Sequence, residues 1–374
     1  MLSKRDCSYT KKIERLLSRY FSYKDLAYER LCKEKQLDPK TLISKVYDPP
    51  DRLILLVTHK CQLRCKYCKV RKFSASMNED VMRKAVNWLF TSSAKEVQIQ
   101  FFGGEPLLRF DIIKKAVEHA EKISKRTKKR VEFLLTTNGI ALTKEKIKFI
   151  KGHDFTVEYS IDGEIENQLK SRSSPNGKKY YSKMLENFRN LEHADITHYS
   201  ISVFTPETVG EMFNNFRHLI DLGFKNLQIN YALGVLWHRG AFEELIHQTR
   251  KITSYIRKRS DITFMNFTSS RKEPVVLNAE LTTDTNGGVY LESGICLEED
   301  FIKMKNNFCV THLKSAKNIC FYGSSQFQNF YRLSKIYAKQ NTEYRKIILN
   351  NIAIGKRYDA FLKNMRKRLN ARTG

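Results

Sequence analysis

The chain has 374 residues, which is enough for one large α/β barrel domain or two smaller domains. No stretch approaches about 18 consecutive apolar residues, and the N-terminus lacks the apolar core of a signal peptide. These features argue against a membrane-spanning or secreted protein, and we expect a cytoplasmic one. The 67 lysines and arginines outnumber the 40 acidic residues, which gives a formal charge of +27. This excess favours a polyanionic partner, unless it reflects only a lysine-rich composition.

Residues 1–50 are charged and helix-prone, and the proline pair at their end marks a boundary before the first strand. Apolar runs then predict strands at 53–57, 97–102, 131–135, 155–161, 196–203 and 227–231. Helical periodicity alternates with them at 79–93, 110–127, 142–150, 178–191, 206–222 and 241–258. Successive strand–helix units predict a parallel sheet. Periodicity alone does not distinguish a partial barrel from an open, doubly wound sheet.

The alternation ends near residue 261. A hairpin is predicted over 275–292 around Asn286-Gly287-Gly288, and one or two basic helices are predicted over 326–371. Residues 331–374 contain twelve lysines or arginines against Glu343 and Asp359, so this tail concentrates the basic character. The patterns predict three parts: an N-terminal helical extension over 1–50, a core over 51–260, and a small α+β C-terminal region over 261–374.

Three cysteines, Cys61, Cys65 and Cys68, follow the first predicted strand with the spacing C-x3-C-x2-C. Thiolates this close on one loop can bind three irons of a [4Fe–4S] cluster, which leaves the fourth iron open to a cofactor or substrate. The alternative is a structural zinc site with His59 or a distant cysteine as fourth ligand. Such sites usually add a second two-ligand group, which the remaining cysteines do not supply. Those cysteines are Cys7, Cys32, Cys296, Cys309 and Cys320.

Three further motifs end predicted strands. The second strand ends in Gly103-Gly104-Glu105-Pro106, where two glycines allow the backbone to approach a ligand closely. The third ends in Thr136-Thr137-Asn138-Gly139. The fourth ends in Ser160-Ile161-Asp162-Gly163, and Arg172 follows, whose guanidinium matches a carboxylate in a bidentate way. Taken singly, each motif could also be a turn, a strand end or a surface charge.

Together these motifs resemble the radical S-adenosylmethionine (SAM) superfamily, in which an aromatic residue, here Tyr67, precedes the third cysteine. The resemblance covers about residues 51–260 and implies a partial (β/α)6 barrel that binds a [4Fe–4S] cluster and SAM. It implies that the cluster ligands are Cys61, Cys65 and Cys68. The cofactor-binding residues that it implies are Tyr67, Gly103, Gly104, Glu105, Pro106, Asn138, Ser160, Asp162 and Arg172.

The resemblance also assigns roles within that set. The Gly-Gly-Glu-Pro motif takes the amino group of SAM, with Glu105 holding the loop, and Ser160 and Arg172 bind the SAM carboxylate. An electron from flavodoxin or ferredoxin would then cleave SAM, and the 5′-deoxyadenosyl radical would abstract hydrogen from a substrate. The resemblance therefore implies that the chain is an enzyme.

Within the superfamily, the chain is most similar to anaerobic sulfatase-maturating enzymes and related peptide maturases. Their cysteine-rich (SPASM) extension typically binds two auxiliary clusters, and residues 283–290 resemble its hairpin. Only Cys296, Cys309 and Cys320 remain in this region. They could form a remnant site for a single cluster, donate a hydrogen atom, or be buried apolar residues. The similarity favours a protein or ribosomally made peptide as the substrate, and the charge favours an acidic one. RNA is the alternative that the charge also supports, although no RNA-binding motif is present.

Overall fold

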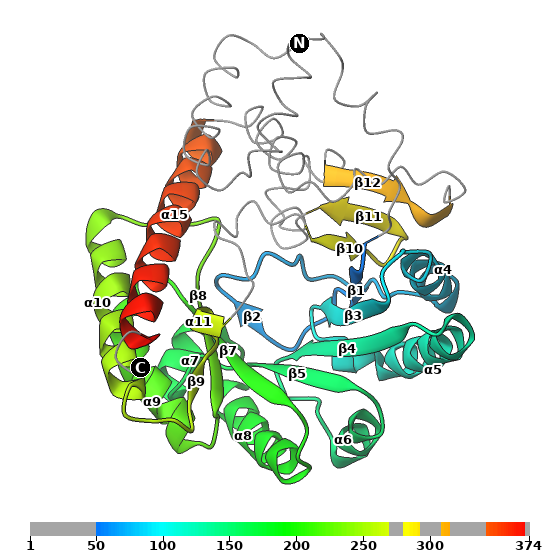
Figure 1. Ribbon diagram of the computed structural model, residues 1–374, viewed down its shortest axis with the longest axis horizontal. Helices are drawn as coiled ribbons and strands as arrows, with labels where there is room; N and C mark the ends of the chain where they lie inside the picture. Colours follow the sequence, from blue (N-terminus) through cyan, green and yellow to red (C-terminus); the bar gives the residue numbers. More distant parts are fainter. Residues whose placement is uncertain (1–49, 269–279, 292–307, 315–341, 371–374) are drawn as a thin grey trace.

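The computed structural model describes residues 50–268, 280–291, 308–314 and 342–370 (Figure 1). The predicted N-terminal helical extension therefore lies outside the described residues, apart from its last position. Cys7, Cys32, Cys296 and Cys320 also lie outside them. Within the described part of the chain, no helix combines the length and the apolar character needed to cross a membrane.

A mostly parallel sheet forms the centre of the molecule, and its six barrel strands follow one another in chain order. Each strand pairs in parallel with the next one along the chain. A doubly wound sheet would instead reverse its strand order near the middle. The predicted α/β fold with a partial barrel is thus confirmed. The strands are β1 (Arg52–Thr58), β3 (Glu96–Gly103), β4 (Arg130–Thr137), β5 (Phe155–Ser160), β7 (His198–Phe204) and β8 (Asn226–Tyr231).

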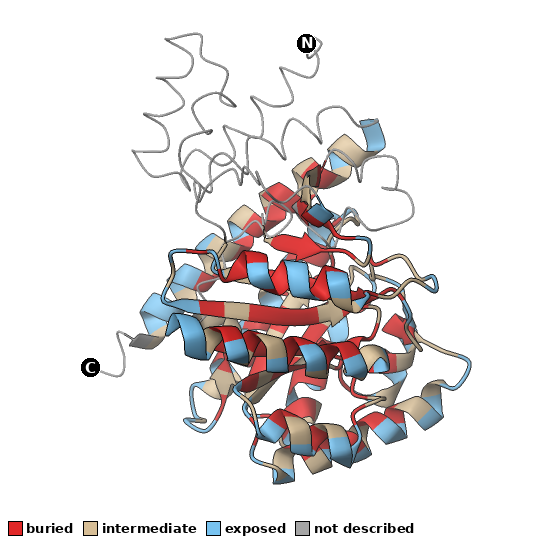
Figure 2. Ribbon diagram, turned by 90° about the vertical axis from the view of Figure 1, so that its right-hand side faces the viewer, coloured by how far each residue is buried: buried red, intermediate tan, exposed pale blue. Residues whose placement is uncertain are grey.

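Amphipathic helices cover the outer side of this curved sheet, with their buried faces turned toward it (Figures 1 and 2). Helix α5, for example, buries Ile112, Ile113, Ala116, Val117, Ala120 and Ile123, the spacing of a single apolar stripe. Several helices begin at a side-chain cap, such as Asn78, which accepts a hydrogen bond from the backbone N–H of Val81. The helices are α4 (Glu79–Leu89), α5 (Phe110–Thr127), α6 (Lys144–Lys151), α8 (Gly177–His193), α9 (Met212–Asp221) and α10 (Arg239–Ile256).

The hydrophobic core lies between the sheet and these helices, where Phe101, Phe133 and Phe155 from three neighbouring strands pack ring against ring. Side chains alternate between the two faces of a strand, so the residues next to each phenylalanine along its strand face the inside of the barrel. Several of those inward residues are polar, including Gln100, Thr136 and Glu158. The barrel therefore has an apolar outer layer and a partly polar interior.

Short elements complete the fold. The predicted hairpin forms from β10 (Leu281–Thr283) and β11 (Gly288–Leu291), and β10 pairs in parallel with β1. The structure also contains β2 (Arg64–Cys65), β6 (Arg172–Ser173), β9 (Thr263–Phe264), β12 (Cys309–His312), α7 (Ile165–Ser171), α11 (Met265–Thr268) and the 3-10 turns η1 (Pro106–Arg109) and η2 (Val209–Glu211). Because β9 and β10 lie beyond residue 260 and join the same sheet, the boundary at 260/261 stays a prediction.

The C-terminal helix α15 (Thr342–Asn370) packs beside α10 (Figure 1) and falls within the region predicted to be helical. Two adjacent asparagines anchor it to the loop after β8. Asn351 accepts a hydrogen bond from the N–H of Gly234 and donates to the carbonyl of Val235, both at 2.8 Å. Asn350 binds the backbone N–H and C=O of Trp237 in the same way. The C-terminal helix thereby fixes the backbone of a barrel loop.

Candidate functional site

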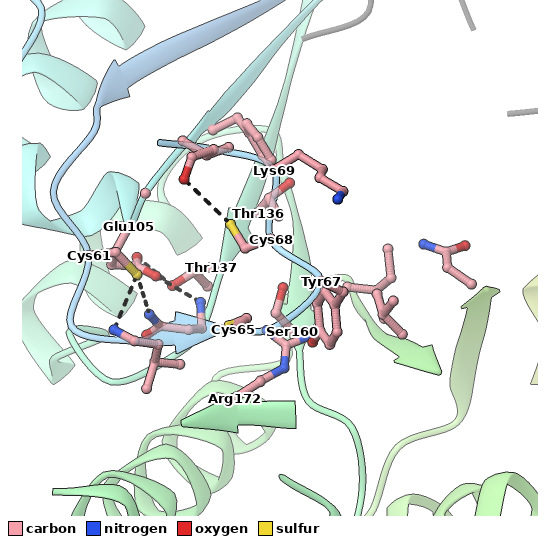
Figure 3. Close-up of a pocket in the computed structure, with 18 of the residues that line it drawn as sticks. Cys61, Cys65, Tyr67, Cys68, Lys69, Glu105, Thr136, Thr137, Ser160 and Arg172 are labelled. Carbon is pink, nitrogen blue, oxygen red and sulfur yellow. Dashed lines mark hydrogen bonds between the residues drawn. The ribbon is translucent and has the colours of Figure 1, made fainter. Parts of the chain in front are cut away.

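A cavity of about 270 Å³ lies at the carboxyl ends of the parallel strands (Figure 3). In this view the three labelled cysteines surround one space, with Tyr67 and Arg172 beside it. Two predicted site residues do not line the cavity. Pro106 is buried at the start of η1, and Asp162 is buried behind Arg172. The predicted residues that do line it are Cys61, Cys65, Tyr67, Cys68, Gly103, Gly104, Glu105, Asn138, Ser160 and Arg172.

The loop that carries the cysteines is held in shape by backbone hydrogen bonds. The N–H of Cys68 donates to the carbonyl of Cys65 at 3.0 Å, which closes a tight turn between these two residues. Strand β2 pairs antiparallel with β6, so that Cys65 stands opposite Arg172. The N–H of Lys66 also donates to the carbonyl of Ser171 at 2.9 Å. A short segment that follows the fourth predicted strand thus supports the cysteine loop.

The chemistry of the three thiols fits an iron–sulfur cluster. Partial burial raises the pKa of Cys61, and it raises that of Cys65 to about 12 although the neighbouring Arg172 acts in the opposite direction. Binding iron would therefore release protons from these thiols. Each thiolate of a [4Fe–4S] cluster binds a different iron, and all three thiols here border one cavity. The residues present thus fit the group that the motif predicts.

Two glycines allow the next strand end to lie directly against the cysteine loop. The N–H of Gly104 donates to the carbonyl of Thr58 at 2.7 Å. A Cβ on Gly103, whose φ is +147°, would lie 2.3 Å from that same carbonyl oxygen. A Cβ on Gly104 would lie 2.2 Å from the carbonyl oxygen of Lys60. The sequence predicted a close approach to a ligand, whereas the contact seen here is to the backbone of the cysteine loop.

Glu105 is buried and connects two strand ends. Its Oε1 accepts hydrogen bonds from the N–H of Leu107 at 3.1 Å and from the hydroxyl of Thr137 at 2.7 Å. Its Oε2 accepts one from the N–H of Asn138 at 2.8 Å. Burial raises the pKa of Glu105, and these hydrogen bonds act against that rise. This is the geometry expected of a residue that holds the loop.

Asp162 organises the opposite wall of the cavity. It receives bonds from the Nε and Nη2 of Arg172 at 3.0 and 3.1 Å, from the hydroxyl of Tyr67 at 2.6 Å, and from the N–H of Val203 at 3.0 Å. Burial opposes the charge of Arg172, yet Asp162 keeps the pKa of Arg172 well above its ordinary value. The carboxylate that Arg172 holds in this structure is therefore that of Asp162. The predicted binding of the SAM carboxylate by Arg172 stays a prediction.

A buried histidine–aspartate pair, which sequence reasoning missed, joins the cysteine loop to the C-terminal hairpin. The Nε2 of His59 lies 2.7 Å from Oδ1 of Asp284, and its Nδ1 lies 2.9 Å from the carbonyl of Arg71. Both ring nitrogens are thus engaged, which argues against His59 as a zinc ligand. Two sequence signals pointed to these residues, although neither connected them. His59 lies two residues before Cys61, and Asp284 lies in the predicted hairpin.

We expect Asp284→Ala to lower the free energy of unfolding by about 1.5–3 kcal/mol, the usual range for a hydrogen bond to a charged group. The loss follows because His59 would stay buried without its partner. Urea denaturation of the metal-free protein would measure it. Asp261→Ala, at an exposed aspartate paired with Arg259, is the control and should change stability little. Equal effects of the two substitutions would contradict the role of the pair.

Comparison with known proteins places this site in a family. Residues 55–222 match the Radical SAM superfamily. Curated relatives include an uncharacterized protein of Methanocaldococcus jannaschii, which is 29% identical over 185 residues covering 49% of this chain and 63% of the relative. A cysteine-type anaerobic sulfatase-maturating enzyme of Clostridium novyi is 23% identical over 229 residues, covering 59% of this chain and 61% of the relative. The chain thus spans less than two thirds of the length of these relatives.

Solved structures share the fold. The structure of anSMEcpe with bound AdoMet superposes with a TM-score of 0.69 at 15% identity, covering 86% of this chain and 95% of that one. Streptococcus suis SuiB bound to its precursor peptide SuiA gives a TM-score of 0.53 at 13% identity, covering 87% of this chain and 75% of that one. The matched segment contains the cysteine triplet and all three strand-end motifs. The match to the Radical SAM superfamily therefore covers the part of this chain, residues 55–222, that carries the candidate site.

Proposed function

We propose that this protein is a radical SAM enzyme that cleaves SAM reductively at a [4Fe–4S] cluster and abstracts hydrogen from a protein or peptide substrate. The observation that carries the proposal is the meeting of three thiols, the glycine motif, Asn138, Ser160 and Arg172 around one cavity. When bound, the cluster and SAM supply the electron transfer and the 5′-deoxyadenosyl radical. The chain itself supplies ligands, orientation and exclusion of water.

The residues divide this work between two walls of the cavity. Cys61, Cys65 and Cys68 would hold three irons and leave the fourth to the amino and carboxylate groups of SAM. Glu105 fixes the glycine motif beside the cysteine loop, where backbone groups can receive the amino group. On the opposite wall, Ser160 presents a hydroxyl to the cavity beside the guanidinium of Arg172. A hydroxyl and a guanidinium are suitable donors to the SAM carboxylate.

Apolar side chains would protect the reactive intermediate. Phe102 of β3, Ile201 and Val203 of β7, and Leu233 of the loop after β8 line the same cavity. An apolar wall of this kind would exclude water and dissolved reactants from the radical, which limits side reactions. The loop that contributes Leu233 is the one held by Asn350 and Asn351 of α15. The C-terminal helix thus supports a wall of the proposed reaction chamber.

A peptide substrate is supported by the relatives and by charge. Relatives at low identity include sulfatase-maturating enzymes and a PqqA peptide cyclase of Bradyrhizobium diazoefficiens. One structural neighbour, anSMEcpe, has been solved with AdoMet and a peptide bound. The net charge of +27 would attract an acidic segment of such a substrate. A flavodoxin or ferredoxin would deliver the electron.

Anaerobic reconstitution with iron and sulfide tests the proposal. We expect about four irons per chain, a broad brown absorbance, and conversion of SAM to 5′-deoxyadenosine and methionine when dithionite is added. Liquid chromatography with mass spectrometry would quantify both products. The same protein without dithionite is the control and should leave SAM intact. A reconstituted protein that binds iron but never releases 5′-deoxyadenosine would contradict the proposed activity.

A further inference from the structure

Glu158 is a buried acid in the barrel interior that neither the cysteine loop nor the strand-end motifs employ. It lies on β5 two residues before Ser160, lines the cavity, and is only 9% exposed. The strand register places it between Thr136 of β4 and Tyr199 of β7. Because side chains on one face of a strand repeat every two residues, Glu158 faces the same side as Ser160.

Only one oxygen of this carboxylate is engaged by the protein. The hydroxyl of Tyr199 donates to Oε2 at 2.6 Å, which holds the side chain in place. No described residue donates a hydrogen bond to Oε1. Oε1 is not fully buried, and Glu158 lines the cavity, so this oxygen is open to a ligand there. Glu158 thus presents an acceptor to whatever fills the barrel.

Three other charged groups of the cavity wall, Glu105, Arg172 and Lys72, contrast with Glu158. Both oxygens of Glu105 are occupied by hydrogen bonds from the protein. Arg172 is paired with Asp162, and the ammonium of Lys72 contacts the sulfur of Cys68 and the carbonyl of Val70. Among the described residues, no ion pair includes Glu158. A carboxylate that is nine-tenths buried with a single hydroxyl partner is unfavourable unless a donor, above all a cation, completes its surroundings.

The depth of Glu158 indicates which molecule brings that cation. Two residues along a strand span about 6.5 Å, so Glu158 lies that much deeper in the barrel than Ser160. If Ser160 contacts SAM, as the proposed function holds, Glu158 lies beyond the cofactor, where the substrate must enter to lose a hydrogen atom. We propose that Glu158, held by Tyr199, binds a cationic side chain of the peptide substrate, an ammonium or guanidinium of the lysine or arginine type. This inference rests on the proposed function.

The substrate would then make two kinds of contact with the protein. The basic exterior would attract an acidic segment of the peptide at long range. The interior instead would select a cationic side chain at the reacting end, because a charge-assisted hydrogen bond to a buried carboxylate is both strong and specific. An acidic peptide that presents one lysine or arginine to the barrel satisfies both requirements.

The test uses two peptides as probes, acetyl-Gly-Lys-Gly-amide and acetyl-Gly-norleucine-Gly-amide, each with a deuterated side chain. Binding to the reconstituted, SAM-bound protein would be measured by saturation-transfer NMR. We expect the lysine peptide to bind at least about tenfold more tightly than the norleucine peptide, as for a charge-assisted hydrogen bond. Deuterium should pass from the lysine peptide to 5′-deoxyadenosine when dithionite is added.

Glu158→Gln should remove the preference for lysine and leave the affinity for SAM unchanged. Tyr199→Phe keeps the carboxylate but frees it to move, so it should reduce the preference only in part. Glu132→Gln is the matched control, because Glu132 also lies on the barrel's inner face but is paired with Arg130 and does not line the cavity. It should behave like the unaltered protein.

Each other outcome is informative. Equal binding of the two peptides by the unaltered protein would overturn the inference. A tenfold loss of SAM affinity in Glu158→Gln would assign this residue to the cofactor and would also overturn it. A protein that binds the lysine peptide through Glu158 but never cleaves SAM would instead refute the proposed function and leave the binding site standing.

Discussion

Replacing any one of Cys61, Cys65 and Cys68 by alanine is expected to reduce SAM cleavage to the background of the assay. Each thiolate would bind a different iron, and two thiolates hold a cubane poorly. The three side chains border one cavity, so each is placed to supply one of the three thiolates. The reductive assay for 5′-deoxyadenosine, together with iron analysis of each variant, would measure the loss.

Cys309→Ala provides the matched control. Cys309 lies on β12, where its thiol contacts the carbonyl of Thr311 at 3.3 Å, and it does not line the cavity. Its substitution should leave iron content and SAM cleavage as they were. Full activity in any variant of the cysteine loop would show that the cluster is held by other residues or that the chemistry does not need it.

Arg172→Ala is expected to destabilise the fold by about 3–5 kcal/mol, the range for breaking a buried ion pair by removing one partner. Asp162 would remain fully buried with its charge uncompensated. Removing both partners by Asp162→Ala/Arg172→Ala should cost less than the sum of the two single substitutions, because neither charge is then left alone. Urea denaturation of the metal-free proteins would complete the double-mutant cycle.

Lys170→Ala, at an exposed lysine on α7, is the control for this cycle and should have little effect on stability. Arg172→Lys should recover little of the lost stability, because an ammonium cannot reproduce the two parallel hydrogen bonds to Asp162. If the loss of unfolding free energy in the double variant equals the sum of the two single losses, the two side chains do not interact energetically.

The same pair has a consequence for cofactor binding. Strand β6 begins at Arg172 and pairs with the strand that contains Cys65. A substitution at Arg172 therefore disturbs the cysteine loop as well as the wall that faces SAM. Ser160 lacks this structural role, since its hydroxyl makes no hydrogen bond to any described residue and its strand is held by the neighbouring strands. Ser160 is thus the cleaner position at which to test contact with the SAM carboxylate.

Much of the architecture follows from local sequence signals. Apolar runs separated by amphipathic segments predicted the six barrel strands, because the alternation of buried and exposed positions depends only on near neighbours. The cysteine triplet and the motifs ending at Pro106, Gly139 and Gly163 could be placed at strand ends for the same reason. Since the carboxyl ends of parallel strands meet on one side of a sheet, these local assignments already brought most of the candidate site together.

Only the tertiary structure revealed the features that depend on contacts between residues far apart in the chain. The strand order distinguished a barrel from a doubly wound sheet, which the same periodicity would produce. His59 and Asp284 are 225 positions apart, and no period in the sequence connects them. Likewise, the pairing with Asp162 gave Arg172 a structural role that the sequence had not predicted. Glu158 became a candidate because folding buries it while leaving one oxygen toward the cavity, and burial is a property of the whole fold.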